Sequence, residues 1–469
     1  MDCVVQAAGP EHIAAVSDQL RRAQRAWNGA GIAHRSRVLA DFHAAISAGR
    51  TTLVSALERD TGRRWASNME VDAVLANIER CRGYATEILA ATSPIPTSDP
   101  TVSRTTDLVP YPLVGAIGPW NFPLQLALID AVPALLAGCA VIVKPSEMTP
   151  RFVPALEQII AGIRELSDVL SIVEGDGSTG AAIASSVDAV CFTGSTATGR
   201  KVAQAASERF IPAFLELGGK DPAIVLRSAD LDASTSAILW GSTVNSGHSC
   251  MSIERVYVDA RIFEPFVDLL VRKAEAVRLA YPGAGDGEIG PIITEPQIAV
   301  IEDQLRDALA RGARVRTGGK LERLGGGTYL RPTVLTSVDH AMRMMQEETF
   351  GPIMPVMPFS TLDEAVELAN DSQFGLSGAV FAGATDEALA VAHRLEVGGV
   401  SINDVCLTGF VPEAEKNSFK LSGLGGSRMG PSSVRRFLRA RALLMRNRAA
   451  QRPWYYDAGW SDGGIPQEN

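Results

Sequence analysis

The chain of 469 residues is predicted to adopt an α/β fold built around parallel sheets. Short, continuous apolar runs recur along it, and segments with helical period separate them. Strands that are buried on both faces and alternate with helices are typical of βαβ units. Because the length exceeds what one hydrophobic core usually supports, we expect two or three domains.

The elements are expected in a definite order. Apolar residues recur at helical spacing from about residue 13 to residue 88, and the proline-punctuated stretch 92–112 predicts an extended arm. A second alternating region covers about 256–405, and the basic segment 435–448 is expected to form an edge strand. Buried parallel strands are expected at 113–117, 140–143, 170–173, 189–192 and 223–225.

Composition and charge limit the classes of partner. A net charge of −9 and a pI near 5.4 argue against nucleic acid. The six cysteines form no CxxC pair, which argues against a zinc site or a disulfide framework and favours a reducing compartment. The apolar stretch 123–143 contains Asp130 and Pro133, so we expect a core helix and strand there, not a membrane span. Without a secretory signal at the start, a cytoplasmic location is expected.

Two segments together predict covalent catalysis. Cys250 ends a small, polar loop that contains Gly247, and Glu216 precedes a Gly-Gly pair at 218–219. A reachable thiol and a mobile carboxylate are a nucleophile and a base. Taken alone, however, a free cysteine is more often a small buried hydrophobe.

Two turns follow expected strands, where open α/β sheets bind ligands. Asn121 lies in the turn 119–123 and could aim its amide at a developing oxyanion, or simply cap the next helix. Lys144 and Glu147 could hold a ribose, or form a surface salt bridge.

A glycine-containing loop at 192–199 leads into a helix, where backbone N–H groups attract a phosphate, and Ser195 adds a hydroxyl. The literal GxGxxG at 175–180 is the weaker candidate, because no acidic residue ends its following strand. Glu348 and Phe350 could contact a second ribose and a nicotinamide, or form an acidic turn with a core aromatic residue.

Taken together, these motifs resemble the aldehyde dehydrogenase superfamily over about residues 27–448. The matching segments are 119–123, 144–147, 192–199, 216–220, 245–250 and 348–352. The resemblance implies a Rossmann-like cofactor domain, an α/β catalytic domain and a small β oligomerisation element. It also implies the NAD(P)-dependent oxidation of an aldehyde to a carboxylic acid.

The resemblance further implies roles for individual residues. Cys250 would attack the aldehyde to give a thiohemiacetal and then a thioester, with the oxyanion held by Asn121 and the Cys250 N–H. Glu216 would activate the water that hydrolyses the thioester. NAD is expected over NADP, because Glu147 repels a 2′-phosphate. Cofactor contacts are expected at Ile117, Trp120, Lys144, Glu147, Gly194, Ser195, Leu217, Gly218, Glu348 and Phe350.

The chain departs from the family pattern at His248, where glutamine is usual, and at 415–418, where Pro-Phe-Gly-Gly is common. A small to medium aldehyde is expected, and a semialdehyde with a second carboxylate is disfavoured. Candidate residues of an apolar substrate tunnel are Leu126, Ile129, Trp240 and Phe410. The alternatives are an NAD-independent cysteine hydrolase that uses Cys250 with His248, and a scaffold without activity.

The expected domain limits follow from these assignments. The NAD-binding domain takes 1–100 and 116–216, and the catalytic domain takes 217–433. Residues 101–115 and 434–469 form the oligomerisation arm and C-terminal tail. Pairing of the arm across a subunit interface would protect its strand edges. The resemblance to the family implies a homodimer or homotetramer.

Overall fold

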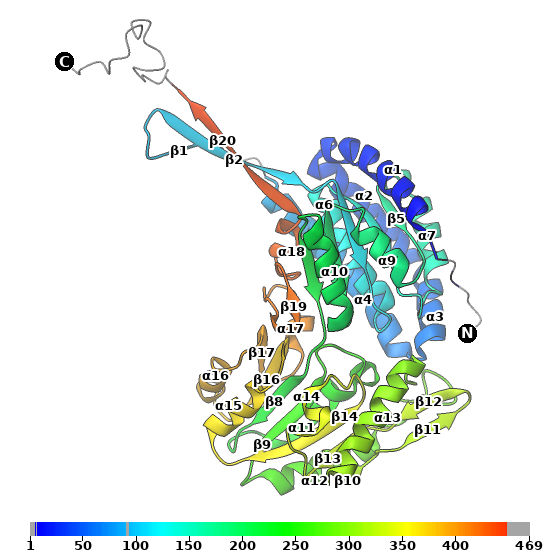
Figure 1. Ribbon diagram of the computed structural model, residues 1–469, viewed down its shortest axis with the longest axis vertical. Helices are drawn as coiled ribbons and strands as arrows, with labels where there is room; N and C mark the ends of the chain where they lie inside the picture. Colours follow the sequence, from blue (N-terminus) through cyan, green and yellow to red (C-terminus); the bar gives the residue numbers. More distant parts are fainter. Residues whose placement is uncertain (1–4, 6, 91–92, 448–469) are drawn as a thin grey trace, which may run out of the picture.

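The computed structural model describes residue 5, residues 7–90 and residues 93–447. Figure 1 shows two α/β halves stacked along the long axis, and a thin β arm that projects from the upper half. Each half contains one large, mostly parallel sheet, which confirms the predicted α/β fold class.

The first sheet lies in the upper half, with strand order β19-β7-β6-β3-β4-β5, and only β19 is antiparallel. Four expected strands are confirmed as β3 to β6, whereas β7 was not anticipated. β19 comes from the range expected to be catalytic and returns to this sheet. The strands are β3 (Leu113–Ile117), β4 (Ala140–Lys144), β5 (Leu170–Ile172), β6 (Ala189–Thr193), β7 (Ala213–Glu216) and β19 (Gly423–Leu424).

The expected helical lead-in is confirmed, and its apolar faces share one core with the first sheet. α4 packs against α2, α3 and α6, while α1 contacts β4 and α9. The lead-in helices are α1 (Pro10–Gly29), α2 (Gly31–Ala48), α3 (Arg50–Thr61) and α4 (Arg64–Ile88). The other helices of this half are α5 (Pro123–Leu128), α6 (Ala131–Ala137), α7 (Val153–Ala161), α8 (Arg164–Ser167), α9 (Gly177–Ala184), α10 (Thr196–Glu208) and α18 (Ser432–Arg435).

The second sheet has strand order β10-β13-β14-β9-β8-β16-β17, and only β10 is antiparallel. Separate two-stranded sheets are formed by β11 with β12 and by β15 with β18. The expected strand at 223–225 is confirmed within β8. The strands are β8 (Asp221–Val225), β9 (Ile253–Asp259), β10 (Arg314–Thr317), β11 (Leu321–Leu324), β12 (Gly327–Leu330), β13 (Thr333–Thr336), β14 (Ile353–Phe359), β15 (Phe374–Gly375), β16 (Ser377–Phe381), β17 (Gly399–Ile402) and β18 (Phe419–Lys420).

Helices cover both faces of this second sheet, and the first of them leads to Cys250. α11 (Leu231–Thr243) runs directly into a 3-10 turn, η1 (Val244–Gly247). The other helices are α12 (Phe263–Ala276), α13 (Glu295–Ala310), α14 (Arg343–Gln346), α15 (Leu362–Asn370), α16 (Thr385–Ala392) and α17 (Leu407–Phe410).

The projecting arm is a three-stranded sheet. β2 (Val102–Pro110) and β20 (Leu438–Arg446) pair antiparallel over their whole length, and β1 (Ile95–Pro96) adds to β2 (Figure 1). The two segments expected to form the oligomerisation element therefore pair within one chain, which leaves β20 with a free edge. Residues 113–115, counted with the arm above, belong to β3. Residues 448–469 of the expected tail lie outside the described residues.

The apolar stretch 123–143 forms α5, α6 and most of β4, all inside the upper half. Within the part of the chain that the structure describes, no helix combines the length and hydropathy needed to cross a bilayer.

Candidate active site

Strand register brings four of the predicted motifs to one edge of the first sheet. Ile117, the last residue of β3, pairs with Lys144 at the end of β4 and with Phe192 on β6. Thr193, the last residue of β6, pairs with Glu216, the last residue of β7. The loops that follow these strands therefore leave from the same carboxyl edge, where ligand sites of open α/β sheets lie.

A strained turn carries Cys250 to this edge. Asn245, Ser246 and Gly247 adopt left-handed backbone angles, with φ of 54°, 57° and 74°. A side chain on Gly247 would come within 2.2 Å of the Gly351 backbone, so the turn packs closely against the segment after Phe350. Left-handed angles are costly for residues other than glycine, so the surroundings must hold the turn in place.

The turn also meets the segment that follows Glu216. A Cβ on Gly219 would lie 2.2 Å from the Cys250 carbonyl oxygen, so only glycine fits here. Cys250 is half-buried. Burial, and then the Glu348 and Glu216 carboxylates, raise the pKa of its thiol to about 12, although Lys416 opposes them. The thiol is therefore protonated at neutral pH.

The Asn121 side chain joins the same turn. Its amide Nδ2 donates to the His248 carbonyl oxygen at 3.0 Å. Asn245 Nδ2 donates to that same oxygen at 3.0 Å and to the Asn121 carbonyl oxygen at 2.9 Å. Asn121 is 4% exposed. The structure thus brings the predicted amide to the loop that ends in the predicted nucleophile.

His248 is fully buried, and its contacts do not favour a role as a catalytic base. Its Nδ1 lies 3.1 Å from Arg63 Nη2 and within 3.2 Å of two carbonyl oxygens of the turn. Its ring packs at right angles to Trp120 and Phe350, with centroids 5.2 and 5.7 Å away. Burial, and then the Arg63 charge, lower the pKa of His248 well below its usual value. The imidazole is therefore neutral and held by the turn, which does not favour the hydrolase alternative.

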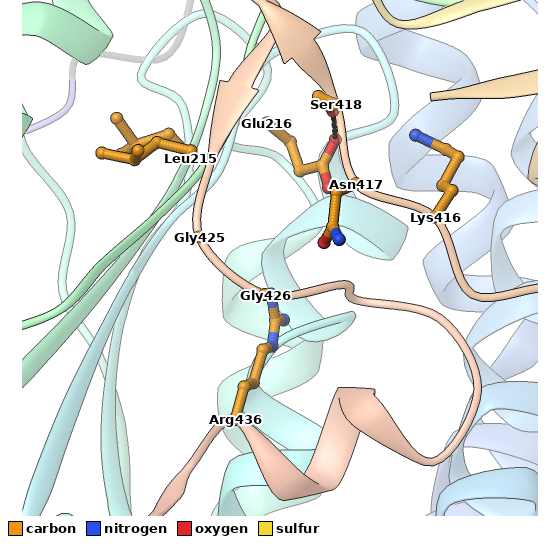
Figure 2. A pocket seen from close by; sticks show the side chains of 9 residues that line it. Leu215, Glu216, Lys416, Asn417, Ser418, Gly425, Gly426 and Arg436 are labelled. Carbon is orange, nitrogen blue, oxygen red and sulfur yellow. Dashed lines mark hydrogen bonds between the residues drawn. The ribbon is translucent and has the colours of Figure 1, made fainter. Parts of the chain in front are cut away.

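The Glu216 carboxylate lines a small hollow between β7 and the segment around 416–418 (Figure 2). Ser418 Oγ donates to Glu216 Oε2 at 3.3 Å. Arg428 Nε lies 3.9 Å from Glu216 Oε1, and its Nη2 donates to Asp130 and to Thr193. Both Ser418 and Arg428 are contacts that no sequence motif indicated.

Glu348 lies against the Gly-Gly pair after Glu216. Its Oε1 accepts the Gly219 N–H at 3.0 Å, and a Cβ on Gly218 would lie 2.6 Å from its Oε2. Burial, and then the Glu254 charge, raise the pKa of Glu348 to about 8. The two predicted site segments are thus in direct contact.

A buried ion pair anchors this contact. Lys220 Nζ donates to Glu254 Oε2 at 2.7 Å, and both side chains are within 2% of full burial. The Glu254 carboxylate also accepts the N–H groups of Thr349 and Phe350, each at 2.7 Å. Sequence reasoning missed this pair, although a glutamate inside the apolar strand β9 is a usable signal, because buried charges are paired.

The remaining predicted cofactor residues also line the carboxyl edge. Lys144 Nζ donates to Glu147 Oε2 at 3.0 Å. Ser195 caps α10 by accepting the Thr198 N–H, and it is exposed. Leu217 touches α10 so closely that a Cβ on Gly199 would lie 2.5 Å from it.

These features fit a dinucleotide. An exposed helix start offers N–H groups to phosphate, and the Lys144–Glu147 pair offers a donor and an acceptor to ribose hydroxyls. Among the described residues, no group of three His, Cys, Asp or Glu side chains gathers at metal-binding distance.

The candidate substrate residues are split between two environments. Trp240 packs against Phe410 with the ring planes tilted by 53° and the centroids 5.4 Å apart, and both are partly exposed. Leu126 lies within α5 and Ile129 directly follows that helix, and both are half-buried. A cavity of about 290 Å³ lies between the start of α4, the end of α11 and residues 280–290, and Trp240 is one of its walls.

Comparison with known proteins agrees with this arrangement. Residues 2–443 match the model of the aldehyde dehydrogenase family. A putative succinate-semialdehyde dehydrogenase [NADP(+)] of Mycolicibacterium smegmatis is 34% identical over 418 residues, which are 88% of this chain and 81% of the relative. The 4,4'-diapolycopene aldehyde oxidase of a Methylomonas species is 36% identical, over 84% of this chain and 74% of that protein.

Solved structures agree as well. The putative aldehyde dehydrogenase PutA from Anabaena variabilis superimposes with a TM-score of 0.95 and 54% identity, covering 97% of each chain. Lactaldehyde dehydrogenase from Escherichia coli gives a TM-score of 0.89 at 30% identity, covering 94% of this chain and 92% of that one. The chain therefore belongs to the aldehyde dehydrogenase family.

Proposed function

We propose that the protein oxidises an aldehyde to the carboxylic acid, with Cys250 as nucleophile, Asn121 as oxyanion donor and Glu216 as the base for hydrolysis. One observation carries the proposal. The turn that ends at Cys250 is bonded to the Asn121 amide on one side and packs against Gly219 on the other. These contacts support a site in which the Asn121 amide and the segment after Glu216 flank the Cys250 turn at the carboxyl edge of the first sheet.

The chemistry follows from these positions. The Cys250 sulfur attacks the carbonyl carbon, and the oxygen that becomes negative accepts hydrogen bonds from the Asn121 amide and the Cys250 N–H. Because burial keeps the thiol protonated, the reactive thiolate is a minor species whose fraction rises with pH. After the substrate carbon has lost a hydride and the thioester has formed, Glu216 takes a proton from water, and the hydroxide displaces the sulfur to release the acid and restore the thiol.

NAD is the cofactor that we propose. When bound, the dinucleotide accepts the hydride that leaves the substrate carbon. Glu147, beside Lys144 at the end of β4, favours a free ribose hydroxyl over a 2′-phosphate, because two negative charges would repel. The relatives named for NADP(+) lean the other way, so the preference is a proposal that must be measured.

An aldehyde of small to medium size with an apolar chain is the proposed substrate. The adjacent Trp240 and Phe410 rings offer an apolar surface to such a chain. The two arginines that line the same cavity as Trp240 already have partners, since Arg63 binds the Cys250 turn and Arg64 binds Glu58. A second carboxylate on the substrate would therefore have no free cation among the described residues that line the 290 Å³ cavity.

The assembly and location stay proposals as well. We propose a homodimer or homotetramer joined through the arm, because β20 leaves one edge unpaired among the described residues and exposes Leu443 and Leu444. The expected cytoplasmic location rests on the cysteine pattern, which favours a reducing compartment.

A panel of aliphatic, aromatic and acidic aldehydes tests the function, with reduced cofactor followed by absorbance for NAD and NADP in parallel. At least one aldehyde should give steady NADH formation, and Cys250→Ser should lower it by on the order of 10³-fold or more while cofactor binding persists. Near-normal turnover in Cys250→Ser would refute the proposed nucleophile.

A further inference from the structure

The Arg63 side chain links the first half of the molecule to the Cys250 turn. It precedes α4, is 5% exposed, and reaches three partners on the second half. Nη1 donates to Asn245 Oδ1 at 2.7 Å, and Nη2 donates to the Pro291 carbonyl at 2.8 Å. Nη2 also lies 3.1 Å from His248 Nδ1. One guanidinium thus contacts two residues of the strained turn and a fixed carbonyl beside it.

Burial and the nearby Arg63 charge both disfavour a charged His248. A guanidinium only donates hydrogen bonds, whereas the Ser246 and Asn245 carbonyl oxygens, 3.0 and 3.2 Å from the same His248 Nδ1, only accept them. Its Nε2 has no hydrogen-bond partner among the described residues, so Nδ1 makes the polar contacts of the ring there. Protonating His248 would place two cations 3.1 Å apart in a buried site, so burial and charge repulsion both disfavour the charged form.

The contact continues from the turn to Asn121. With its Oδ1 held by Arg63, Asn245 must point its amide nitrogen the other way. That nitrogen donates to the Asn121 carbonyl and to the His248 carbonyl, which also accepts from the Asn121 amide. Arg63 therefore fixes which end of Asn245 faces Asn121, and with it the position of the amide proposed to hold the oxyanion.

We propose that Arg63 is a positioning residue for the reaction. Through Asn245 and His248, it holds the Asn121 amide and the Cys250 turn in the geometry that the reaction needs. The proposal rests on the roles proposed above for Cys250 and Asn121. It assigns a chemical task to a residue outside every motif of the sequence. Small displacements of aligned groups cost much of the rate, so a loosened turn should slow attack by the thiol.

The 290 Å³ cavity makes a direct test possible. Arg63 and Asn245 form part of its wall, and two further wall residues, Trp65 and Trp240, are 54% and 38% exposed. The cavity therefore opens to solvent. In Arg63→Ala the truncated side chain leaves a space next to Asn245 that free guanidinium can reach and fill, with the same planar donors.

The experiment compares Arg63→Ala with Arg50→Ala in the full chain, using the pre-steady-state burst of NADH and thermal unfolding. Arg50 bridges α3 and α4 through Asp72 and Asn68 and touches no residue of the turn. Arg63→Ala should slow the burst by about tenfold or more, with little change in cofactor binding. Millimolar guanidinium should restore much of that rate, whereas urea at the same concentration should not. Arg50→Ala should keep the wild-type burst.

Two results would overturn the proposal. One is a wild-type burst rate in Arg63→Ala. The other is a folded Arg63→Ala protein that is slow but gains nothing from guanidinium, because general loosening would then explain the loss. If Arg63→Ala does not fold, His248→Gln and His248→Ala replace it: an amide oxygen accepts from Arg63 and should keep the burst, and alanine should lose it. Failure of the wild-type protein to reduce either NAD or NADP with any aldehyde would instead defeat the proposed function.

Discussion

The two sides of the candidate site are built in different ways. The side proposed to bind the cofactor is an edge of four parallel strands, so backbone register sets where its loops begin. The side that carries Cys250 is an irregular turn with two left-handed residues other than glycine, at Asn245 and Ser246. Such residues cost about 1–3 kcal/mol each, and contacts from elsewhere in the chain must offset that cost.

The difference shows where precision comes from in this molecule. Register needs only that apolar strands pair, and many sequences satisfy that requirement. The turn needs specific partners at long range, such as Arg63, 182 positions before Asn245, and Gly351 beside Gly247. Changes at the turn should therefore affect reactivity sharply, and changes at the strand edge should affect binding or stability by graded amounts.

The largest expected effect concerns the turn itself. Burial and nearby carboxylates raise the pKa of Cys250 to about 12, so deprotonation is incomplete until the pH passes that value. Alkylation of Cys250 by iodoacetamide without cofactor should rise about tenfold per pH unit, or about 10³-fold between pH 7 and 10. Mass spectrometry of the Cys250 peptide measures the rate, with circular dichroism to confirm folding. A plateau of the alkylation rate near pH 8 would mean that burial and the nearby carboxylates do not raise the pKa of the Cys250 thiol this far.

The next effect concerns Glu216, at the junction of the two sides. Replacing it by glutamine keeps the shape but removes the base, so the first turnover should persist as a burst of NADH. Steady turnover should fall by about 10²-fold or more. Stopped-flow absorbance separates the two phases. Ser418→Ala, which removes a hydrogen bond to the same carboxylate, is a milder control. Loss of the burst in Glu216→Gln would contradict a role confined to hydrolysis.

The sequence was sufficient to predict the strand-edge side. Apolar runs located β3 to β6, and the motifs after them fall at the carboxyl edge because parallel strands must align there. It was less informative about β7, whose four residues give too little pattern, and about β19, which joins the sheet from far along the chain.

The turn side was only partly predictable. Cys250 was identified from its glycine-bearing loop, and His248 was considered as a base only in the hydrolase alternative. Arg63 escaped notice because a lone arginine before a helix has no distinguishing pattern. Its partners appear only when the two halves of the chain are folded together. Contacts between residues this far apart in the sequence cannot be inferred from local periodicity.

A third prediction tests the support behind the strand edge. Asp130 is 4% exposed and binds both Arg428 and Arg436, which are buried too. Although burial alone would raise it, the two arginines hold the pKa of Asp130 below its usual value. Asp130→Asn leaves two buried guanidinium groups without their anion and should lower the free energy of unfolding by about 3–5 kcal/mol.

Denaturant unfolding measures this loss. The matched control is Asp107→Asn, whose pair with Arg441 is exposed and should contribute about 1 kcal/mol or less. Because the folded pKa of Asp130 is lowered, its contribution should be complete above the ordinary pKa of an aspartate and fade as pH falls through the folded value. Equal losses in the two variants would show that burial does not distinguish these pairs.

The smallest expected effect is a change of cofactor preference at the strand edge. Glu147→Gln removes a negative charge from the position proposed to face the ribose and frees Lys144, now 3.0 Å from the carboxylate, to attract a phosphate. The ratio of kcat/KM for NADP to that for NAD should rise roughly tenfold, the equivalent of about 1.4 kcal/mol. Glu165→Gln changes the net charge equally but lies in an exposed pair with Arg37, so it should leave the ratio unchanged. Since backbone register places this loop, the variant should keep the burst rate of Cys250. A fall in that rate would show that the two sides of the site are coupled, and an unchanged ratio would remove Glu147 from cofactor selection.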